Sequence, residues 1–201
     1  MTNWFAANWL EIFGVATMLG YLYLEIKQKP AMWVLGIISS FVYIFIYFDA
    51  KIYAVASLNV YYVIVSIYGF MLWQKDKVSV KERKDDSSAQ ISYSNLSWKL
   101  GLILLLITAL IYVLIVYVLK TYTDSPVLYE DSLVTSLSIV ATWMLAKKII
   151  QHWYVWIFVN AFSVYLYYTT ELYLTAILFA IYGSLSIVGY LNWKKGTPDR
   201  V

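Results

Sequence analysis

The sequence predicts an all-α membrane protein with seven transmembrane helices. Three observations support this prediction: an apolar composition, seven long apolar runs and an internal repeat. Of the 201 residues, 62% are hydrophobic and 13% are charged, against roughly 45–50% and about 25% in ordinary soluble domains. A soluble globule of this size could not cover so much apolar surface with polar side chains. The composition therefore excludes a soluble enzyme, a nucleic-acid-binding protein and a disordered chain.

The seven runs approach the roughly 20 apolar residues that a helix needs to cross a bilayer core of about 30 Å. A tight turn near Thr169–Glu171 must separate the last two runs, and the polar stretch Gln74–Ser97 predicts a solvated loop between two halves. The predicted helices cover residues 8–26, 31–48, 53–73, 98–119, 131–148, 153–169 and 171–193.

The distribution of basic residues predicts that the N-terminus lies outside and the C-terminus inside. With this orientation, Lys51 and Lys120 are the only basic residues in outer loops, and every other Lys and Arg lies in an inner loop or the tail. Cytoplasmic loops of membrane proteins carry such an excess of Lys and Arg.

An internal repeat becomes visible when the chain is shifted by 120 residues. Trp33 then matches Trp153, Trp73 matches Trp193, and Glu11 meets Asp131 at the start of each half. Other matched pairs include Tyr62 with Tyr182, Ser66 with Ser186 and Gly69 with Gly189. Matched tryptophans at both ends of one register favour a true repeat over chance similarity.

The repeat predicts a 3+1+3 arrangement. The predicted parts are a first three-helix repeat (1–75), a cytosolic loop (76–97), a linker transmembrane helix (98–119), an outer loop (120–130), a second three-helix repeat (131–195) and a cytosolic tail (196–201). The linker helix gives both triplets the same orientation, as in SWEET-type transporters, whose substrate site lies between the repeats near the membrane midplane. The repeat therefore favours a transporter.

The sequence lacks the residues that several kinds of binding site and active site require. There is no Cys and only one His, so neither disulfides nor a His or Cys metal site is expected, and no cofactor is implied. No ionisable residue lies near the centre of a predicted helix, which favours passive transport over ion coupling. The chain also lacks a phosphate-binding loop and the residue sets of intramembrane proteases, so we do not expect an enzyme.

The candidate substrate site consists of two amides and two indoles. Asn59 and Asn160 lie at membrane depth, where an unpaired amide costs several kcal/mol by order of magnitude, so each must face the bundle interior. Trp153, Trp156 and Asn160 share one stripe of a helix and could stack an aromatic ligand and bind its polar edge. The alternatives are an interhelical hydrogen bond for each amide and an interfacial position for Trp153.

The stretch from Glu130 to Tyr168 resembles the PnuC family of vitamin transporters. The shared marks are an acidic residue opening the helix (Asp131), a basic turn (Lys147–Lys148) and a WxxWxxxN motif. LEIFG, WVLGIISS and LNVYYVIVSIYGFMLW in the first half support the resemblance. It implies substrate binding by Trp153, Trp156 and Asn160, with Asn59 as a partner. It gives Glu11 and Asp131 helix-end or gating roles.

The resemblance implies import of a phosphate-free B-vitamin through the inner (cytoplasmic) membrane by facilitated diffusion. A cytosolic vitamin kinase would then trap the substrate. We expect nicotinamide riboside, with thiamine or riboflavin as alternatives. A non-transporting scaffold would not need two inward amides, and a SWEET-type sugar carrier is expected to have prolines within its helices, whereas Pro30, Pro126 and Pro198 lie in loops or the tail. The expected partners are the vitamin and the lipid bilayer, not nucleic acid, and a homo-oligomer is compatible with the sequence.

Overall fold

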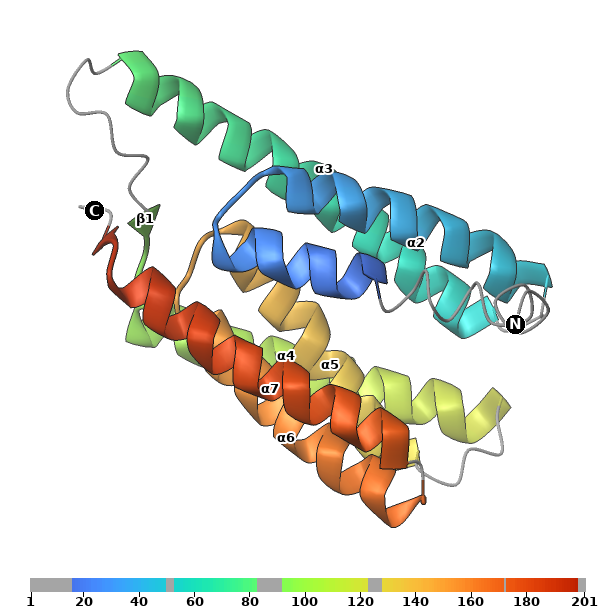
Figure 1. Ribbon diagram of the computed structural model, residues 1–201. Helices are drawn as coiled ribbons and strands as arrows, with labels where there is room; N and C mark the ends of the chain where they lie inside the picture. The colour runs from blue at the N-terminus through green and yellow to red at the C-terminus, as the bar shows by residue number, and fades with distance from the viewer. Residues whose placement is uncertain (1–15, 50–52, 83–91, 123–127, 172, 199–201) are drawn as a thin grey trace, which may run out of the picture. The chain divides into compact units, whose positions relative to one another are not determined.

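The computed structural model describes residues 16–49, 53–82, 92–122, 128–171 and 173–198 (Figure 1). A first helix covers residues 16–26 of this part. The other elements are α2 (Ala31–Asp49), α3 (Tyr53–Glu82), β1 (Ser92–Tyr93), α4 (Trp98–Tyr122), α5 (Leu128–Ala146), α6 (His152–Thr169), α7 (Tyr173–Lys194) and β2 (Thr197–Pro198). The described part of the chain thus contains seven helices, the number that the sequence predicts.

The helix boundaries follow the apolar runs, with one clear exception. The predicted turn near Thr169–Glu171 is present, because α6 ends at Thr169 and Glu171 has a positive φ of 62°. In contrast, α3 continues to Glu82, well into the stretch predicted as a loop. This extension is rich in Lys, Glu and Gln, which are good helix formers even when nothing apolar is buried. The prediction of a loop beginning at Gln74 was therefore wrong.

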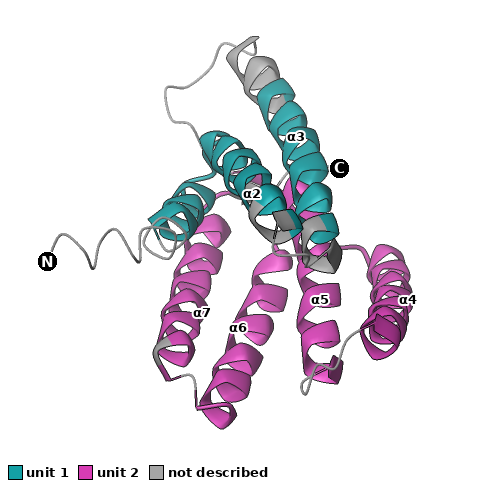
Figure 2. Ribbon diagram, turned by 90° about the vertical axis from the view of Figure 1, so that its right-hand side faces the viewer, with its two compact units in different colours: residues 1–89 teal, residues 90–201 magenta. Residues whose placement is uncertain are grey.

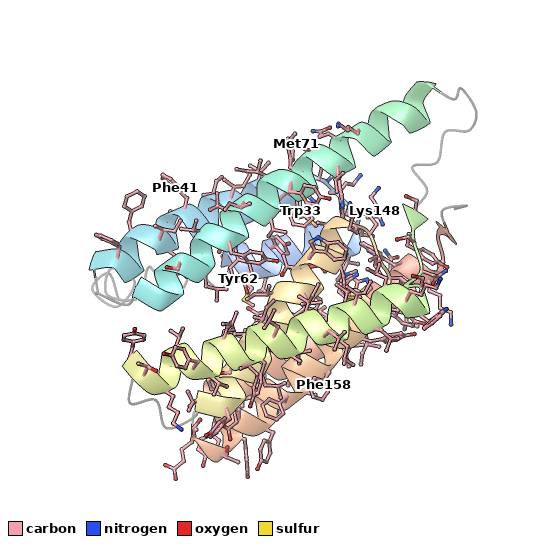
Figure 3. The ribbon with its side chains drawn as sticks, turned by 180° about the vertical axis from the view of Figure 1, so that it is seen from behind. Trp33, Phe41, Tyr62, Met71, Lys148 and Phe158 are labelled. Carbon is pink, nitrogen blue, oxygen red and sulfur yellow. The ribbon has the colours of Figure 1, made fainter. Side chains whose placement is uncertain are left out.

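The chain divides into two compact units, residues 1–89 and 90–201 (Figure 2). In the first unit α2 packs along α3, and the helix over residues 16–26 meets α2 where Tyr21 forms an edge-to-face contact with Trp33. Trp33 and Trp73 are almost completely buried here. Phe41 and Met71 point away from α2 and α3 (Figure 3), and more than half of each side chain is exposed.

In the second unit, helices α4, α5, α6 and α7 follow one another side by side (Figure 2). A small cluster of Leu104, Val140, Met144 and Ile149 joins α4 to α5 and to the turn that follows α5. Leu104 is the only buried side chain of α4, although nearly every residue of this helix is apolar. An apolar helix with so little protein around it has a surface suited to lipid.

The residues before α4 form a strap across one end of the second unit. β1 pairs in parallel with β2, so that Ser92 lies opposite Thr197. Next along the chain, Ser94 donates its N–H to Lys148 O and accepts from Ile150 N–H, each at 3.0 Å. We refer to residues 92–97 as the strap. It ties the start of α4 to the α5–α6 turn and to the segment after α7.

The turns that precede α2 and α6 share the same backbone hydrogen bonds, 120 residues apart. Gln28 (φ 52°) and Lys148 (φ 53°) take the left-handed conformation that ends a helix. Gln28 N–H donates to Glu25 O, and Lys148 N–H donates to Leu145 O, both at 2.9 Å. The repeated sequence register therefore corresponds to a repeated local structure.

By length and hydropathy, two helices of the described chain could cross a membrane. They are α4 and the Thr175–Lys194 part of α7, while Ala31–Phe45 is a shorter apolar helix. The sequence predicts seven spans. α5 illustrates why a predicted span can be less hydrophobic, since it carries five serine and threonine residues: Ser132, Thr135, Ser136, Ser138 and Thr142.

Candidate functional site

Helix α6 positions the three candidate residues of the WxxWxxxN motif. The helix follows the α5–α6 turn directly, has no Gly or Pro, and leaves Trp153, Trp156 and Asn160 along one stripe. Trp153 and Asn160 are buried, and Trp156 is half-buried. The stripe therefore faces protein over most of its length, whereas Phe158 on the same helix points outward (Figure 3).

Trp153 occupies a tightly packed socket. Its side chain is fully buried, and its ring meets the Trp193 ring edge-to-face at 5.8 Å between centroids. A Cβ atom at Gly189 would lie 2.3 Å from this indole, so only glycine leaves room for the ring. His152 also stacks against it, with centroids 4.7 Å apart. We call this arrangement of Trp153, Trp193 and Gly189 the Trp–Gly socket.

The first unit contains the same socket at the matching positions. Trp33 meets Trp73 edge-to-face at 5.6 Å, and a Cβ at Gly69 would lie 2.5 Å from the Trp33 ring. The residues that would match Trp156 and Asn160 in this unit are Gly36 and Ser40. The socket therefore occurs both with and without the other two residues of the motif. This indicates that Trp153 has primarily a packing role.

Trp156 differs from Trp153 in having no counterpart in the first unit. A Cβ at Gly36 would lie 2.8 Å from Ser66 Oγ and 3.3 Å from the Tyr21 ring, so a side chain at that position would force both neighbours to shift. At the matching position, the second unit has the indole of Trp156. The Nε1 atom of Trp156 is buried and has no hydrogen-bond partner among the residues that the structure describes. A buried N–H without an acceptor is costly, and a ligand acceptor would relieve that cost.

Asn160 is the centre of a short hydrogen-bond network between α6 and α7. Its Nδ2 donates to Trp156 O at 2.8 Å and to Ser186 Oγ at 3.4 Å. Ser186 Oγ in turn donates to Tyr182 O at 2.8 Å. The interhelical hydrogen bond that the sequence offered as an alternative role for Asn160 is thus present. It uses only the nitrogen of the amide.

Sequence reasoning did not select Tyr182 and Ser186 as site residues. Ser186 is 2% exposed and holds the Asn160 amide. Tyr182 is 3% exposed, and within the described part of the chain its buried hydroxyl has no hydrogen-bond partner. Both residues belong to the matched pairs of the internal repeat. That match, combined with their polarity on an apolar helix, was the signal that could have identified them.

The remaining candidates lie apart from this group or outside the described residues. Asn59 belongs to α3 in the first unit, is 8% exposed and takes part in a polar contact. Asp131 lies with Glu130 in the first turn of α5, where negative charge interacts favourably with the helix dipole. Glu11 lies outside the described residues.

The side chains that α6 and α7 place near Asn160 are uncharged. From Trp153 to Trp193 the chain contains one charged residue, Glu171, and it lies in the α6–α7 turn. Among the residues with a described position, no three His, Asp or Glu side chains come together as a metal site would require. An indole face, two buried donors and an amide oxygen suit an uncharged or cationic aromatic ligand with polar substituents. Within the segment from Trp153 to Trp193, a phosphate would find no cationic side chain.

Comparison with known proteins finds the same kind of transporter by sequence model and by individual relatives. The sequence model of a family described as nicotinamide mononucleotide transporter matches residues 8–195. The nicotinamide riboside transporter PnuC of Escherichia coli K12 is 22% identical over 96% of this chain and 88% of its own. The protein of the same name from Neisseria mucosa is 24% identical over 94% and 73% of the two chains.

A solved structure shares the fold. The crystal structure of the vitamin B3 transporter PnuC aligns with a TM-score of 0.68 and 22% sequence identity, covering 94% of this chain and 81% of that one.

Proposed function

Because the chain belongs to the nicotinamide mononucleotide transporter family, we propose that it carries nicotinamide riboside across a membrane. The observation that carries this proposal is the family match over residues 8–195, together with relatives named as nicotinamide riboside transporters over most of their length. The helices α6 and α7 around Asn160 support the riboside over the mononucleotide, because the segment from Trp153 to Trp193 contains no cationic side chain for a phosphate.

The proposed site contains Trp156 and Asn160 from α6, with Trp153 supporting them from the Trp–Gly socket and Asn59 as a partner from the other repeat. The pyridinium ring of nicotinamide riboside is cationic and aromatic, so stacking on an indole would gain both dispersion and cation–π attraction. The buried Trp156 Nε1 supplies a donor for an oxygen of the ligand. Glu11 and Asp131 are proposed as helix-end or gating residues.

The proposed transport mechanism is facilitated diffusion by alternating access between the two triplets. Ionisable groups that drive coupled transport lie within spans and form relays there. In the described chain the buried acidic and basic side chains are Glu25, Lys148 and His152, and all three lie at helix ends or in a turn. Phosphorylation by a cytosolic kinase would then retain the vitamin.

We place the chain in the inner membrane, with seven spans in a 3+1+3 arrangement and the C-terminus in the cytosol. In the second unit, the strap, the α5–α6 turn and the end of α7 lie at one end. Four lysines lie in these segments, and a fifth, Lys99, lies in the first turn of α4 directly after the strap; the four are Lys147, Lys148, Lys194 and Lys195. The positive-inside rule assigns this end to the cytosol. A homo-oligomer is compatible with this placement.

The test is a binding titration on the detergent-solubilised protein, followed by tryptophan fluorescence. Nicotinamide riboside, thiamine and riboflavin are compared, each with its phosphorylated form as a control. The proposal predicts saturable binding of nicotinamide riboside and much weaker binding of nicotinamide mononucleotide. Selective binding of thiamine would assign a different vitamin to the same site. If a folded protein bound none of the three, the substrate proposal would be wrong.

A further inference from the structure

We infer that Ser186 is a positioning residue that fixes the orientation of the Asn160 amide and thereby selects ligands that donate a hydrogen bond. This inference rests on the proposed function and extends it to the discrimination between closely related pyridine ribosides. It depends on three hydrogen bonds and on the burial of both side chains.

The donor and acceptor roles in this network follow from one another, starting from the carbonyl of Tyr182. A main-chain carbonyl can only accept, so Ser186 must use its single O–H proton to donate to Tyr182 O, at 2.8 Å. Toward Asn160 the Ser186 oxygen can therefore only accept. The amide group facing it at 3.4 Å must then be Nδ2, the donor end of Asn160.

The second contact of Asn160 requires the same orientation. Nδ2 also lies 2.8 Å from Trp156 O, another group that can only accept. Rotating the amide by half a turn would bring its oxygen against two acceptors and lose both hydrogen bonds. At a site where Asn160 is 6% exposed and Ser186 is 2% exposed, water cannot readily replace them.

Both N–H groups of Asn160 are thus occupied, and among the described residues its Oδ1 has no hydrogen-bond partner, so it is the part of the amide left for a ligand. An asparagine held in this way is an acceptor only. It can accept from the N–H₂ of a carboxamide, but a carboxylate in the same place would bring two oxygens together. Sites built to hydrogen-bond one partner discriminate strongly against an analogue that lacks it, because buried polar groups are left unpaired.

The predicted consequence is selectivity for nicotinamide riboside over nicotinic acid riboside. The two molecules differ in the group at carbon 3 of the ring, which is a carboxamide in the first and a carboxylate in the second. The carboxylate also cancels the positive charge of the ring and so weakens its attraction to the indole. A substitution of Ser186 separates the hydrogen-bond effect from the ring-charge effect. It alters how the Asn160 amide is held and leaves the indole of Trp156 in place.

The experiment measures the affinities of both ribosides for the wild type, Ser186→Ala, Ser186→Thr and Ser184→Ala by isothermal titration calorimetry in detergent. Ser184 is the matched control, since it is an exposed serine of the same helix that donates only to Ala180 O. We expect the wild type to prefer nicotinamide riboside by at least about tenfold, a difference of about 1.4 kcal/mol. Ser186→Ala removes one of the two acceptors that hold the amide in this orientation, so the amide can turn more easily and the preference should fall by about threefold or more.

Ser186→Thr retains the hydroxyl and should keep most of the preference, and Ser184→Ala should keep all of it. An unchanged preference in Ser186→Ala, with nicotinamide riboside still bound, would overturn the inference. So would a wild type that binds both ribosides equally well, a result that does not depend on the folding of any variant. Failure of the folded wild type to bind either riboside would instead contradict the proposed function.

Discussion

The indole of Trp153 lies so close to Gly189 that a Cβ atom on the glycine would come within 2.3 Å of the ring. The same relationship joins Trp33 to Gly69 in the first unit. Each glycine allows a large aromatic ring to pack directly on the backbone of the neighbouring helix. A second tryptophan then packs edge-to-face against that ring. These contacts make the Trp–Gly socket a structural element of each unit.

Gly189→Ala should therefore destabilise the protein. An added methyl in a well-packed core typically costs about 1–3 kcal/mol, and a rigid indole cannot move aside easily. Gly101→Ala is the matched control, because a Cβ there would meet Leu96 Cδ2 at an ordinary 3.5 Å. Thermal unfolding in detergent should show a lower midpoint for Gly189→Ala and an equal or higher midpoint for Gly101→Ala. Equal midpoints for both variants would show that the socket tolerates a methyl group.

Trp153→Ala and Trp156→Ala should have different principal effects. Removing the fully buried Trp153 leaves a cavity, and core truncations of this size cost about 3–5 kcal/mol. Trp156 is half-buried, so its loss should reduce vitamin affinity more than stability. Thermal unfolding and ligand titration on the same samples separate the two effects. A Trp153→Ala variant of normal stability that no longer binds vitamin would reverse the role assigned to Trp153.

Asn160→Leu should abolish vitamin binding while leaving a folded, membrane-inserted protein. Leucine is close to asparagine in size but offers no acceptor to the ligand, and it also leaves Ser186 Oγ without its donor. Asn192→Leu near the end of α7 is the control for an asparagine-to-leucine change and should bind normally. Titration after size-exclusion chromatography measures both. Normal binding by Asn160→Leu would remove Asn160 from the site.

Gln151→Leu should loosen the strap. Gln151 Oε1 accepts from Leu96 N–H at 2.9 Å, and its Nε2 donates to Asn95 Oδ1 at 3.3 Å. Without this side chain, the amides of Leu96 and Ile150 should exchange with deuterium about tenfold faster or more, corresponding to a loss of about 1.4 kcal/mol. Hydrogen-exchange mass spectrometry resolves the two peptides.

The control for the strap is Ser97→Ala, since Ser97 Oγ accepts only from Leu100 N–H, within the first turn of α4. Faster exchange should then be confined to that turn. If Gln151→Leu left exchange at Leu96 and Ile150 unchanged, the main-chain hydrogen bonds of Ser94 would be sufficient to hold the strap.

The helices could be predicted because burial in a bilayer requires long apolar runs, and such runs are visible in composition alone. The end of α3 was not predicted as helix, because helices were expected only where the sequence is apolar. Its last residues are polar, and polarity was interpreted as a loop although Lys, Glu and Gln also favour helix. The strap could not be predicted, because main-chain hydrogen bonds between distant segments leave almost no trace in the side chains that form them.

The residues of the candidate site can be proposed from the sequence only in part, and their roles stay predictions. Trp156 and Asn160 were identifiable as an indole and an amide on an apolar helix. Their roles depend on details that composition does not contain, such as the direction of the bond between Asn160 and Ser186. Trp153 was grouped with them because it shares their stripe. The matching socket around Trp33 favours a packing role for Trp153, and the sequence alone gives no sign of it.

The strap also imposes an order on biosynthesis. The Trp–Gly socket of the first unit joins helices that are near neighbours in the chain, so it can close early. The hydrogen bonds of Ser94, Leu96 and Asn95 reach 53 to 56 positions ahead and must wait for the α5–α6 turn. β1 waits longer still, because Thr197 and Pro198 leave the ribosome after all seven helices have been made. The pairing of β1 with β2 therefore marks the end of assembly, and the start of α4 stays unanchored at β1 until then.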